Sequence, residues 1–586
     1  MDDCASKILS EEYTDFIVNF IGSDDEARSK FGVECFQRIS SYYGSIFVPL
    51  TELNSLAGMK SGFDAIPALY GLMERDIAVR VKDLDRALEE SGILRLRNQP
   101  VLALKGQGCI MAFIDSGIDI FDKEFRFSNG DTRILRLWDM TDTTGEPPEG
   151  ILYGSEYTDL DINRILRGRN EIDNGGENDI RNSLNGRTEM QSSKIPGQDE
   201  TNHGNVLAKI AAGNSGAVPE AYLVVVKLKL AKRYLRDYYF VKDGAIAYQE
   251  NDIMLAVNYV RSVALKLNMP ISLCMALGTN GRSHDGTSAL SYILDRFVSS
   301  TGMVASISVG DEGNKQLHAS GTVGVSSELI DVKDRIDVNG RLSTDKDNNR
   351  FDTVEIRIDE RQQGLIINIW GGRPGIISVG LVSPTGEVIE QVEPRIGKSE
   401  IYNLIFDGTT VRIDYDLVES DSGSELIVVK LERLTGGIWT IRIYGQGEKY
   451  NVYLPISQFV YENTYILEPD PDITIIDPGY SRGVITTSLY NSVNGALYID
   501  NGRGFGRGGE VKPDLATALS CAVTAGAACQ FLNWGIVEEK DTSLTATEIK
   551  SYMIRGAMRD SSLVYPNNQW GYGKLDVYNS FQVIKG

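Results

Sequence analysis

Strand-length apolar runs alternate with stretches of helical periodicity in the middle of the chain, and this alternation constrains the fold more than any other feature. The runs cover residues 107–115, 221–227, 270–277 and 303–309, and residues 252–267 have a helical pattern. A strand that is apolar at nearly every position is buried on both faces, and a helix between two such strands carries the chain back across the sheet. The sequence therefore predicts an α/β region in which a mostly parallel sheet is flanked by helices.

Two other regions have different patterns. Residues 13–20 and 44–50 alternate like strands among helical patterns, which predicts a small α+β unit at the N-terminus. From about residue 325 to 475, strand patterns are separated by Gly, Asp and Pro turns with little helix between them, which predicts an all-β sandwich of the jelly-roll type. The α/β character returns after that, with a helical run after Ala516. The sandwich therefore interrupts the α/β region.

These patterns divide the chain of 586 residues, which is too long for one compact core, into four segments. We expect an α+β unit at 1–94, the first part of the α/β domain at 95–324, the sandwich at 325–474 and the second part of the α/β domain at 475–586.

The charge and the apolar content exclude several classes of partner. The formal net charge is −22, and an acidic surface repels both nucleic acid and anionic membranes. No stretch approaches the roughly 20 apolar residues of a membrane span, and the acidic N-terminus lacks the basic and apolar regions of a secretory signal. We therefore expect no nucleic-acid partner and no membrane partner, whereas the oligomeric state stays open.

The six cysteines are scattered, and no pair has the spacing of metal ligands. Cys109 and Cys274 lie in apolar runs, where a buried free thiol is the expected state. This usage predicts a reducing, cytoplasmic location.

Candidate catalytic residues follow from the histidines, of which there are three: His203, His284 and His318. Asp115 ends an apolar strand and opens an Asp-Ser-Gly turn, at the strand end where α/β active sites lie. His203 lies between Asn and Gly at the start of the apolar helix 206–212, from which it can reach a strand-end Asp. An Asp in such a place also serves as a turn or cap residue. His284 and His318 have no second His or Cys at ligand spacing, so we expect no metal and no cofactor.

In this order the two motifs resemble those of the subtilases, which read Asp-(Ser/Thr)-Gly, then His-Gly-Thr, then Gly-Thr-Ser-x-Ala. Residues 278–286, 310–314, 512–514 and 570–573 resemble counterparts in one branch, the Csp-type germination proteases of spore formers and their bacterial relatives. The resemblance covers nearly the whole chain. It implies a subtilisin-like domain with an N-terminal prodomain, an inserted jelly roll and a cleft that binds a peptide or protein segment, including the chain's own prodomain.

The resemblance fails at the nucleophile. Anchoring on Ala525 and Gly526 places Ala518 where the family has its Ser, and the turn-rich loop before that Ser is missing. Ser520 is the alternative nucleophile, two residues further on. If both residues lay on one helix, Ser520 would be rotated by roughly 200° away from His203.

A second departure concerns the oxyanion hole. The family places an Asn there, in Gly-Asn-Glu-Gly-Asn, and this chain has Asp311. An ionised carboxylate accepts hydrogen bonds and donates none, so it would repel the oxyanion. Asn205 replaces the Thr of the family's His-Gly-Thr, which is a peripheral change.

The strand Met275, Ala276, Leu277 and Gly278 resembles the subtilase edge strand that pairs with a substrate peptide. Pairing of this kind uses backbone groups, so it can persist without catalysis. The sequence therefore predicts a pseudoprotease with a binding or regulatory role, by analogy connected with spore germination, in which Asp115 and His203 are retained remnants. The alternative is an active endopeptidase that uses Asp115, His203 and Ser520.

Overall fold

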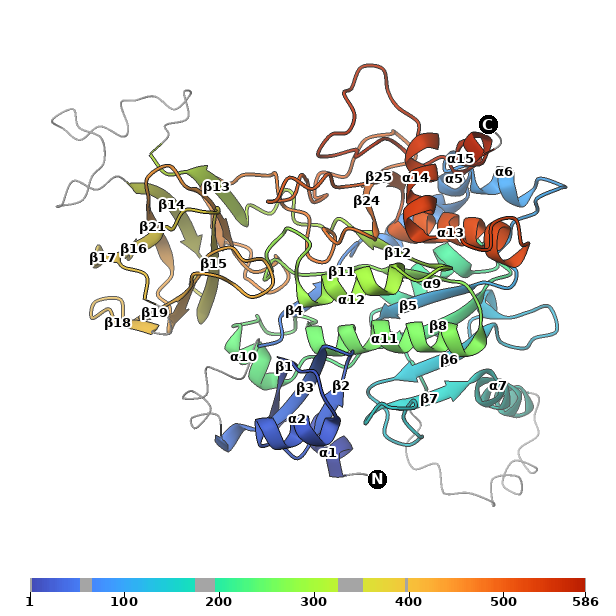
Figure 1. Ribbon diagram of the computed structural model, residues 1–586, viewed down its shortest axis with the longest axis horizontal. Coiled ribbons are helices and arrows are strands. Elements are labelled where there is room, and N and C mark those ends of the chain that lie inside the picture. The colour runs from blue at the N-terminus through green and yellow to red at the C-terminus, as the bar shows by residue number, and fades with distance from the viewer. Residues whose placement is uncertain (1–2, 53–65, 174–194, 325–350, 396–398, 585–586) are drawn as a thin grey trace.

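The computed structural model describes residues 3–52, 66–173, 195–324, 351–395 and 399–584. Figure 1 shows three parts: a small N-terminal unit, a large α/β domain, and a β-sandwich that extends from one side of that domain.

The α/β domain is built on an eight-stranded sheet with the order β25-β24-β12-β10-β5-β8-β6-β7. Its strands are β5 (Ile110–Asp115), β6 (Ile134–Asp139), β7 (Ser155–Thr158), β8 (Tyr222–Lys227), β10 (Ile271–Met275), β12 (Met303–Ser308), β24 (Ile485–Tyr490) and β25 (Leu515–Ala518). Every neighbouring pair is parallel except β6 and β7, which are antiparallel. All residues of β5, β10 and β12 are buried, as their apolar runs predict, and all residues of β24 are buried as well.

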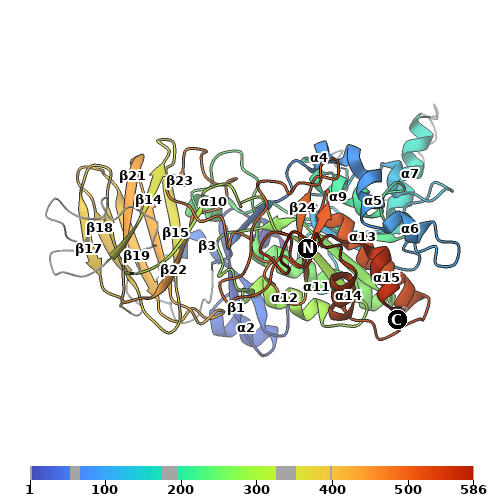
Figure 2. The same ribbon diagram turned by 90° about the horizontal axis from the view of Figure 1, so that it is seen from above.

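Helices cover both faces of this sheet. They include α7 (Asp159–Asp173), α9 (His203–Ala212), α11 (Glu250–Leu267), α12 (Ala289–Val298), α13 (Cys521–Leu532), α14 (Ala546–Gly556) and α15 (Val577–Ile584). α9 and α13 pack against each other and against β5, and α11 packs against α12. Figure 2 shows these two pairs on opposite sides of the sheet. Within the described residues, no helix combines the length and the apolar character that crossing a membrane requires.

The predicted helical run after Ala516 begins later than expected, because Leu515–Ala518 forms the edge strand β25, which pairs in parallel with β24. Leu519 follows with a left-handed φ of 76°, and α13 begins only at Cys521. The apolar residues of a buried edge strand and of a buried helix have the same composition, so the sequence pattern does not separate them.

The N-terminal unit contains the antiparallel sheet β1-β3-β2, formed by β1 (Tyr13–Asn19), β2 (Phe36–Arg38) and β3 (Tyr43–Pro49), with α1 (Asp3–Leu9) and α2 (Asp24–Phe31) beside it. A disulfide joins Cys4 to Cys35. The sequence analysis did not predict this bond, because the spacing of two cysteines does not reveal that the fold brings them together. Cys109, Cys274, Cys521 and Cys529 are buried free thiols.

The strand β4 (Leu69–Leu72) leaves the N-terminal unit and enters the α/β domain. There it lies between two short strands, β9 (Tyr248–Gln249) and β11 (Leu277–Gly278), and is antiparallel to both. The short helices α4 (Ile77–Arg80), α5 (Leu84–Glu90) and α6 (Ile93–Arg97) follow and lead to β5.

The β-sandwich consists of two antiparallel sheets, β13-β22-β15-β20-β19-β18 and β17-β16-β21-β14-β23. Its strands are β13 (His318–Thr322), β14 (Phe351–Ile358), β15 (Gly364–Gly371), β16 (Ser378–Val382), β17 (Val388–Val392), β18 (Ser399–Asn403), β19 (Thr410–Asp416), β20 (Leu426–Glu432), β21 (Gly437–Tyr444), β22 (Lys449–Tyr453) and β23 (Tyr465–Ile466). Alternate residues of β19 and β20 point into a separate apolar core, as the predicted all-β pattern requires. The sandwich lies between β12 and β24 in the chain, so the α/β domain is interrupted as expected.

A buried ion pair fastens the N-terminal unit to the α/β domain. Asp15 on β1 accepts a 2.6 Å hydrogen bond from the Lys232 ammonium, and Gln249 and Asn251 donate two more. Burial raises the pKa of Asp15, but the charges of Lys232 and Lys229 outweigh burial and lower it. Because these charges lie out of water, the pair holds the two parts together only while both partners are present.

We predict that Asp15→Asn loosens this interface. The substitution leaves the Lys232 ammonium buried without its counter-ion, which costs about 3 kcal/mol, or roughly a hundredfold in a local opening equilibrium. Hydrogen exchange of the β1 amides, followed by mass spectrometry, measures this change. Breaking the exposed Lys266–Glu149 pair by Glu149→Gln is the matched control and should leave the exchange unaltered. Equal exchange in both variants would contradict the prediction.

Candidate active site

Asp115 and His203 meet at the carboxyl edge of the sheet. Asp115 ends β5 and His203 begins α9, and the imidazole Nδ1 lies 2.8 Å from Asp115 Oδ1. The backbone N–H and the hydroxyl of Ser116 donate to the same carboxylate oxygen. The structure thus brings together the two residues that the sequence motifs singled out, through strand-end and helix-start positions 88 residues apart.

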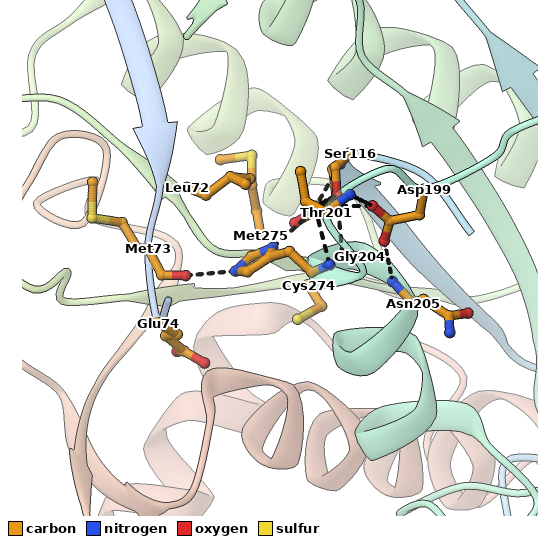
Figure 3. A network of polar contacts seen from close by, with 12 residues as sticks. Leu72, Met73, Glu74, Ser116, Asp199, Thr201, Gly204, Asn205, Cys274 and Met275 are labelled. Carbon is orange, nitrogen blue, oxygen red and sulfur yellow. Dashed lines mark hydrogen bonds and ion pairs between the residues drawn. The ribbon is translucent and has the colours of Figure 1, made fainter. Parts of the chain in front are cut away.

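The loop before His203 is held by its own hydrogen bonds, which Figure 3 shows. Thr201 Oγ1 lies 2.7 Å from Ser116 Oγ, and Asp199 accepts a bond from the backbone N–H of Asn205. Asn202, with a left-handed φ of 60°, turns the chain into α9. Asn205 thus contributes its backbone to the loop, and its side chain donates to Asn202.

The other nitrogen of His203 faces the docked N-terminal segment instead of a nucleophile. Nε2 lies 2.6 Å from the main-chain oxygen of Met73 (Figure 3). Burial lowers the pKa of His203, but the charge and hydrogen bond of Asp115, the Met73 carbonyl and the charge of Glu74 outweigh it and raise the pKa to about 9. At neutral pH both ring nitrogens therefore carry protons, and Nε2–H donates to Met73.

Ser520 caps the N-terminus of α13. Its hydroxyl accepts a 3.1 Å bond from the Ala522 N–H and donates to Glu74 Oε2 at 2.5 Å. Because the helix begins at Cys521, Ser520 does not lie on a helix with Ala518, and the predicted rotation of Ser520 away from the site does not apply. In the described part of the chain, the Ser520 hydroxyl and the His203 ring form no hydrogen bond with each other. The hydroxyl donates to Glu74 instead, and the ring contacts the Met73 carbonyl.

Ala518 lies at the end of β25, where it pairs with Tyr490 and is 1% exposed. Its methyl group packs in the core of the α/β domain. It has no group that could attack a carbonyl.

Asp311 lies in the loop after β12 and faces the docked segment. Its Oδ2 accepts a 3.3 Å bond from the backbone N–H of Arg75 and lies 3.8 Å from Arg75 Nε. The next residue, Glu312, accepts bonds from the backbone N–H and hydroxyl of Ser457. Burial raises the pKa of Glu312 to about 7, although those bonds and the charge of Arg75 lower it.

The predicted peptide-binding strand pairs with the chain's own segment 69–73. Leu277 and Gly278 are antiparallel partners of Leu72 and Gly71, and the Met73 N–H donates to the Ala276 carbonyl at 2.8 Å. Met275 ends β10 and does not pair with the segment; its carbonyl faces the Cys521 thiol at 4.0 Å. On the opposite side, β9 completes a three-stranded sheet with β4 in the middle.

The loop between β22 and β23 of the β-sandwich contacts the docked segment. The Gln458 side chain donates to the Leu72 carbonyl, and Ser457 Oγ lies 3.2 Å from Arg75 Nη2. Further back, the Tyr70 hydroxyl donates to Asp477 at 2.7 Å. Burial raises the pKa of Asp477 to about 6, against the hydrogen bonds from Tyr70 and Ser288.

Sequence reasoning missed the residues of the docked segment itself, above all Met73 and Glu74. The segment has no motif, and its strand pairs only with residues some 200 positions away. The prodomain that the resemblance implies could have indicated that such residues exist, because a prodomain of this kind needs a segment that enters the cleft. No group of three or more His, Cys, Asp or Glu side chains among the described residues is arranged to hold a metal ion.

A paired Asp and His at the carboxyl edge of a parallel sheet, a helix capped by Ser520 and a peptide strand beside β11 together define the subtilisin-like serine protease fold. The predicted resemblance is confirmed at the level of the fold. The chain is similar in structure to the CspB protease of Clostridium perfringens, with a TM-score of 0.69, 21% sequence identity, and coverage of 85% of this chain and 97% of that chain.

Two other solved structures match the chain with lower TM-scores. The epidermin leader peptide processing serine protease EpiP of Staphylococcus aureus matches with a TM-score of 0.43 and 10% identity, covering 98% of this chain and 99% of that one. Fervidolysin from Fervidobacterium pennivorans matches with a TM-score of 0.37 and 10% identity, covering 97% and 61%. No protein-family model matches the chain. No curated protein sequence matches it either.

We predict that His203 titrates near pH 9 in the folded protein, as its raised pKa requires. Because this value lies above the ordinary 6.5, protonated His203 stabilises the fold fully below pH 6.5, and this contribution, about 3 kcal/mol, is lost as the pH rises through 9. Ring-carbon NMR of the three histidines measures the titration, and Asp115→Asn should bring the pKa of His203 down. A His203 signal that titrates at or below 6.5 in the wild-type protein would contradict the assignment.

Proposed function

We propose that this chain is a catalytically inactive protein of the subtilisin-like fold, which uses its cleft to bind a peptide segment and not to cut one. The observation that carries the proposal is Asp311, whose carboxylate faces the docked backbone where the resemblance places the oxyanion donor. An ionised carboxylate donates no hydrogen bond. Loss of one oxyanion donor lowers the rate by about 10²–10³, and a negative charge in its place adds repulsion.

The protonation state of His203 supports the same proposal. A general base must accept a proton from the nucleophile. With a pKa of about 9, His203 already carries a proton on Nε2 at neutral pH, and this N–H donates a hydrogen bond to the Met73 carbonyl. While segment 69–75 is docked, His203 therefore does not activate a hydroxyl group.

In this proposal Asp115 and His203 are retained remnants, Ser520 serves as the N-terminal cap of α13, Ala518 is a core residue at the end of β25, and residues 1–94 act as a retained prodomain. The segments 95–324 and 475–586 supply the cleft, and 325–474 supplies its cover. The resemblance to the Csp branch extends the proposal to a binding or regulatory role in spore germination, in the cytoplasm or associated with the spore.

One observation favours a second function, an active endopeptidase that uses Asp115, His203 and Ser520. Ser520 lies at the N-terminus of α13, and nucleophile and base need to come within about 2.6–3.2 Å of each other. Their present partners, Met73 for His203 and Glu74 for Ser520, belong to the docked segment. If the segment leaves, Ser520 and His203 are free to approach, and His203 loses the Met73 and Glu74 contacts that raise its pKa.

Fluorophosphonate labelling separates the two functions. Because the docked segment covers Ser520, the test compares the wild-type protein with Glu74→Ala, which removes the hydrogen bonds from Ser520 and the Cys521 N–H. We expect no label in either protein. A label in Glu74→Ala that disappears in Glu74→Ala/Ser520→Ala would overturn the proposal and establish the peptidase.

The chain itself offers a second test. Met73 donates to Ala276 and its carbonyl contacts His203, so the bond between Met73 and Glu74 is the one that an active site would cut. We predict that the purified full-length protein keeps its intact mass during storage at neutral pH. Mass spectrometry that finds a new N-terminus at Glu74, absent in Ser520→Ala, would contradict inactivity.

A further inference from the structure

We infer that the altered catalytic positions form a recognition site for an acidic–basic residue pair, so that the cleft binds protein segments with a Tyr four residues before a Glu-Arg pair. This inference rests on the proposed function, because it assigns to Ser520 and Asp311 a role in binding. The ligand class is an extended peptide, and segment 69–75 is the occupant that reveals it.

Glu74 shows how the acidic residue is recognised. Its side chain is fully buried, and its two oxygens accept separate bonds, one from the Ser520 hydroxyl and one from the Cys521 N–H at 3.0 Å. These donors lie at the start of α13, where the partial positive charge of the helix favours an anion. Glu74 also has a left-handed φ of 59°. This conformation is unfavourable for any residue other than glycine, and the contacts of the Glu74 side chain maintain it.

Arg75 shows how the basic residue is recognised. Its backbone N–H donates to Asp311 Oδ2, its Nε lies 3.8 Å from that oxygen, and Nη2 bonds Ser457. Ser457 is in turn held by Glu312. An Asn in place of Asp311 would lack the charge that attracts the guanidinium, so the residue that opposes catalysis favours this ligand.

The cleft also recognises two earlier positions of the docked segment, Tyr70 and Gly71. The fully buried Tyr70 donates its hydroxyl to Asp477, which Ser288 also contacts at 2.8 Å. A Cβ on Gly71 would lie 2.6 Å from Ile456 Cδ1 and 3.0 Å from Gln458 Nε2. The cleft therefore favours Tyr-Gly, then two apolar residues, then Glu-Arg.

A free ligand must compete with a tethered one. A segment of the same chain has an effective concentration of about millimolar, so a peptide of equal affinity displaces it poorly. The site is best tested after the chain's own segment has been weakened without altering the residues that recognise it. Tyr70→Ala/Glu74→Ala does this, because Asp477, Ser520 and Asp311 stay in place.

The probe is a fluorescein-labelled peptide with the sequence of residues 67–77. We expect it to bind full-length Tyr70→Ala/Glu74→Ala, measured by fluorescence anisotropy, at least tenfold more tightly than the wild-type protein. Replacing Glu by Gln in the peptide, or Tyr by Phe, should each weaken binding by roughly tenfold, because a buried partner group loses its hydrogen bond. A peptide in which Glu and Arg exchange places is the composition-matched control and should bind worst.

The outcomes distinguish this inference from the proposed function. Binding with recovery of intact peptide by mass spectrometry supports both. Binding followed by a cut between Met and Glu supports the recognition site and overturns inactivity. Equal binding of the exchanged peptide, or no binding to a variant whose circular dichroism matches the wild type, overturns the recognition site and leaves inactivity to the labelling test.

A second measurement covers the case in which the double variant does not fold. Asp477→Asn in the otherwise wild-type chain weakens the acceptor for Tyr70, so hydrogen exchange across residues 69–75 should accelerate by roughly tenfold. Asp560→Asn, a change of an exposed carboxylate elsewhere, is the matched control. Unchanged hydrogen exchange in Asp477→Asn would overturn the inference that the cleft recognises Tyr70 through Asp477.

Discussion

The antiparallel pairing of β4 with β11 is the interaction on which the rest of the site depends. Backbone bonds along Gly278 and Ala276 fix the register of the segment, and that register brings the Met73 carbonyl to His203 and the Glu74 carboxylate to α13. A shift of one residue would turn every side chain to the opposite face. The state of the catalytic groups is therefore set by a strand from another part of the chain.

Charge explains why the docked state is stable in a chain of such acidity. His203 is cationic between the carboxylates of Asp115 and Glu74, and the guanidinium of Arg75 lies beside Asp311. The Glu74 carboxylate also accepts a bond from the Cys521 N–H at the N-terminus of α13. In this arrangement the protonated imidazole points at the Met73 carbonyl oxygen and has no free lone pair with which to accept a further proton.

The layer architecture could be predicted because burial on both faces leaves a direct mark on the sequence, as in 110–115 and 303–308. The pairing of Asp115 with His203 could also be predicted, since strand ends and helix starts meet at one edge of a parallel sheet. The place of Ser520 at the start of α13 could not be predicted. The boundary between β25 and α13 depends on pairing with β24 and on the left-handed Leu519, and neither is visible in an apolar run.

The sequence by itself determined the parallel sheet, the interrupting β-sandwich, the ordered Asp and His, and the presence of Asp311, because each follows from local composition or from residue identity. Only the tertiary structure decided what those groups do. Glu74 and Asp477 have no motif, and they act through contacts with residues roughly 400 positions away. Such contacts depend on the whole chain closing around segment 69–75, so they exist only once the domains have packed together.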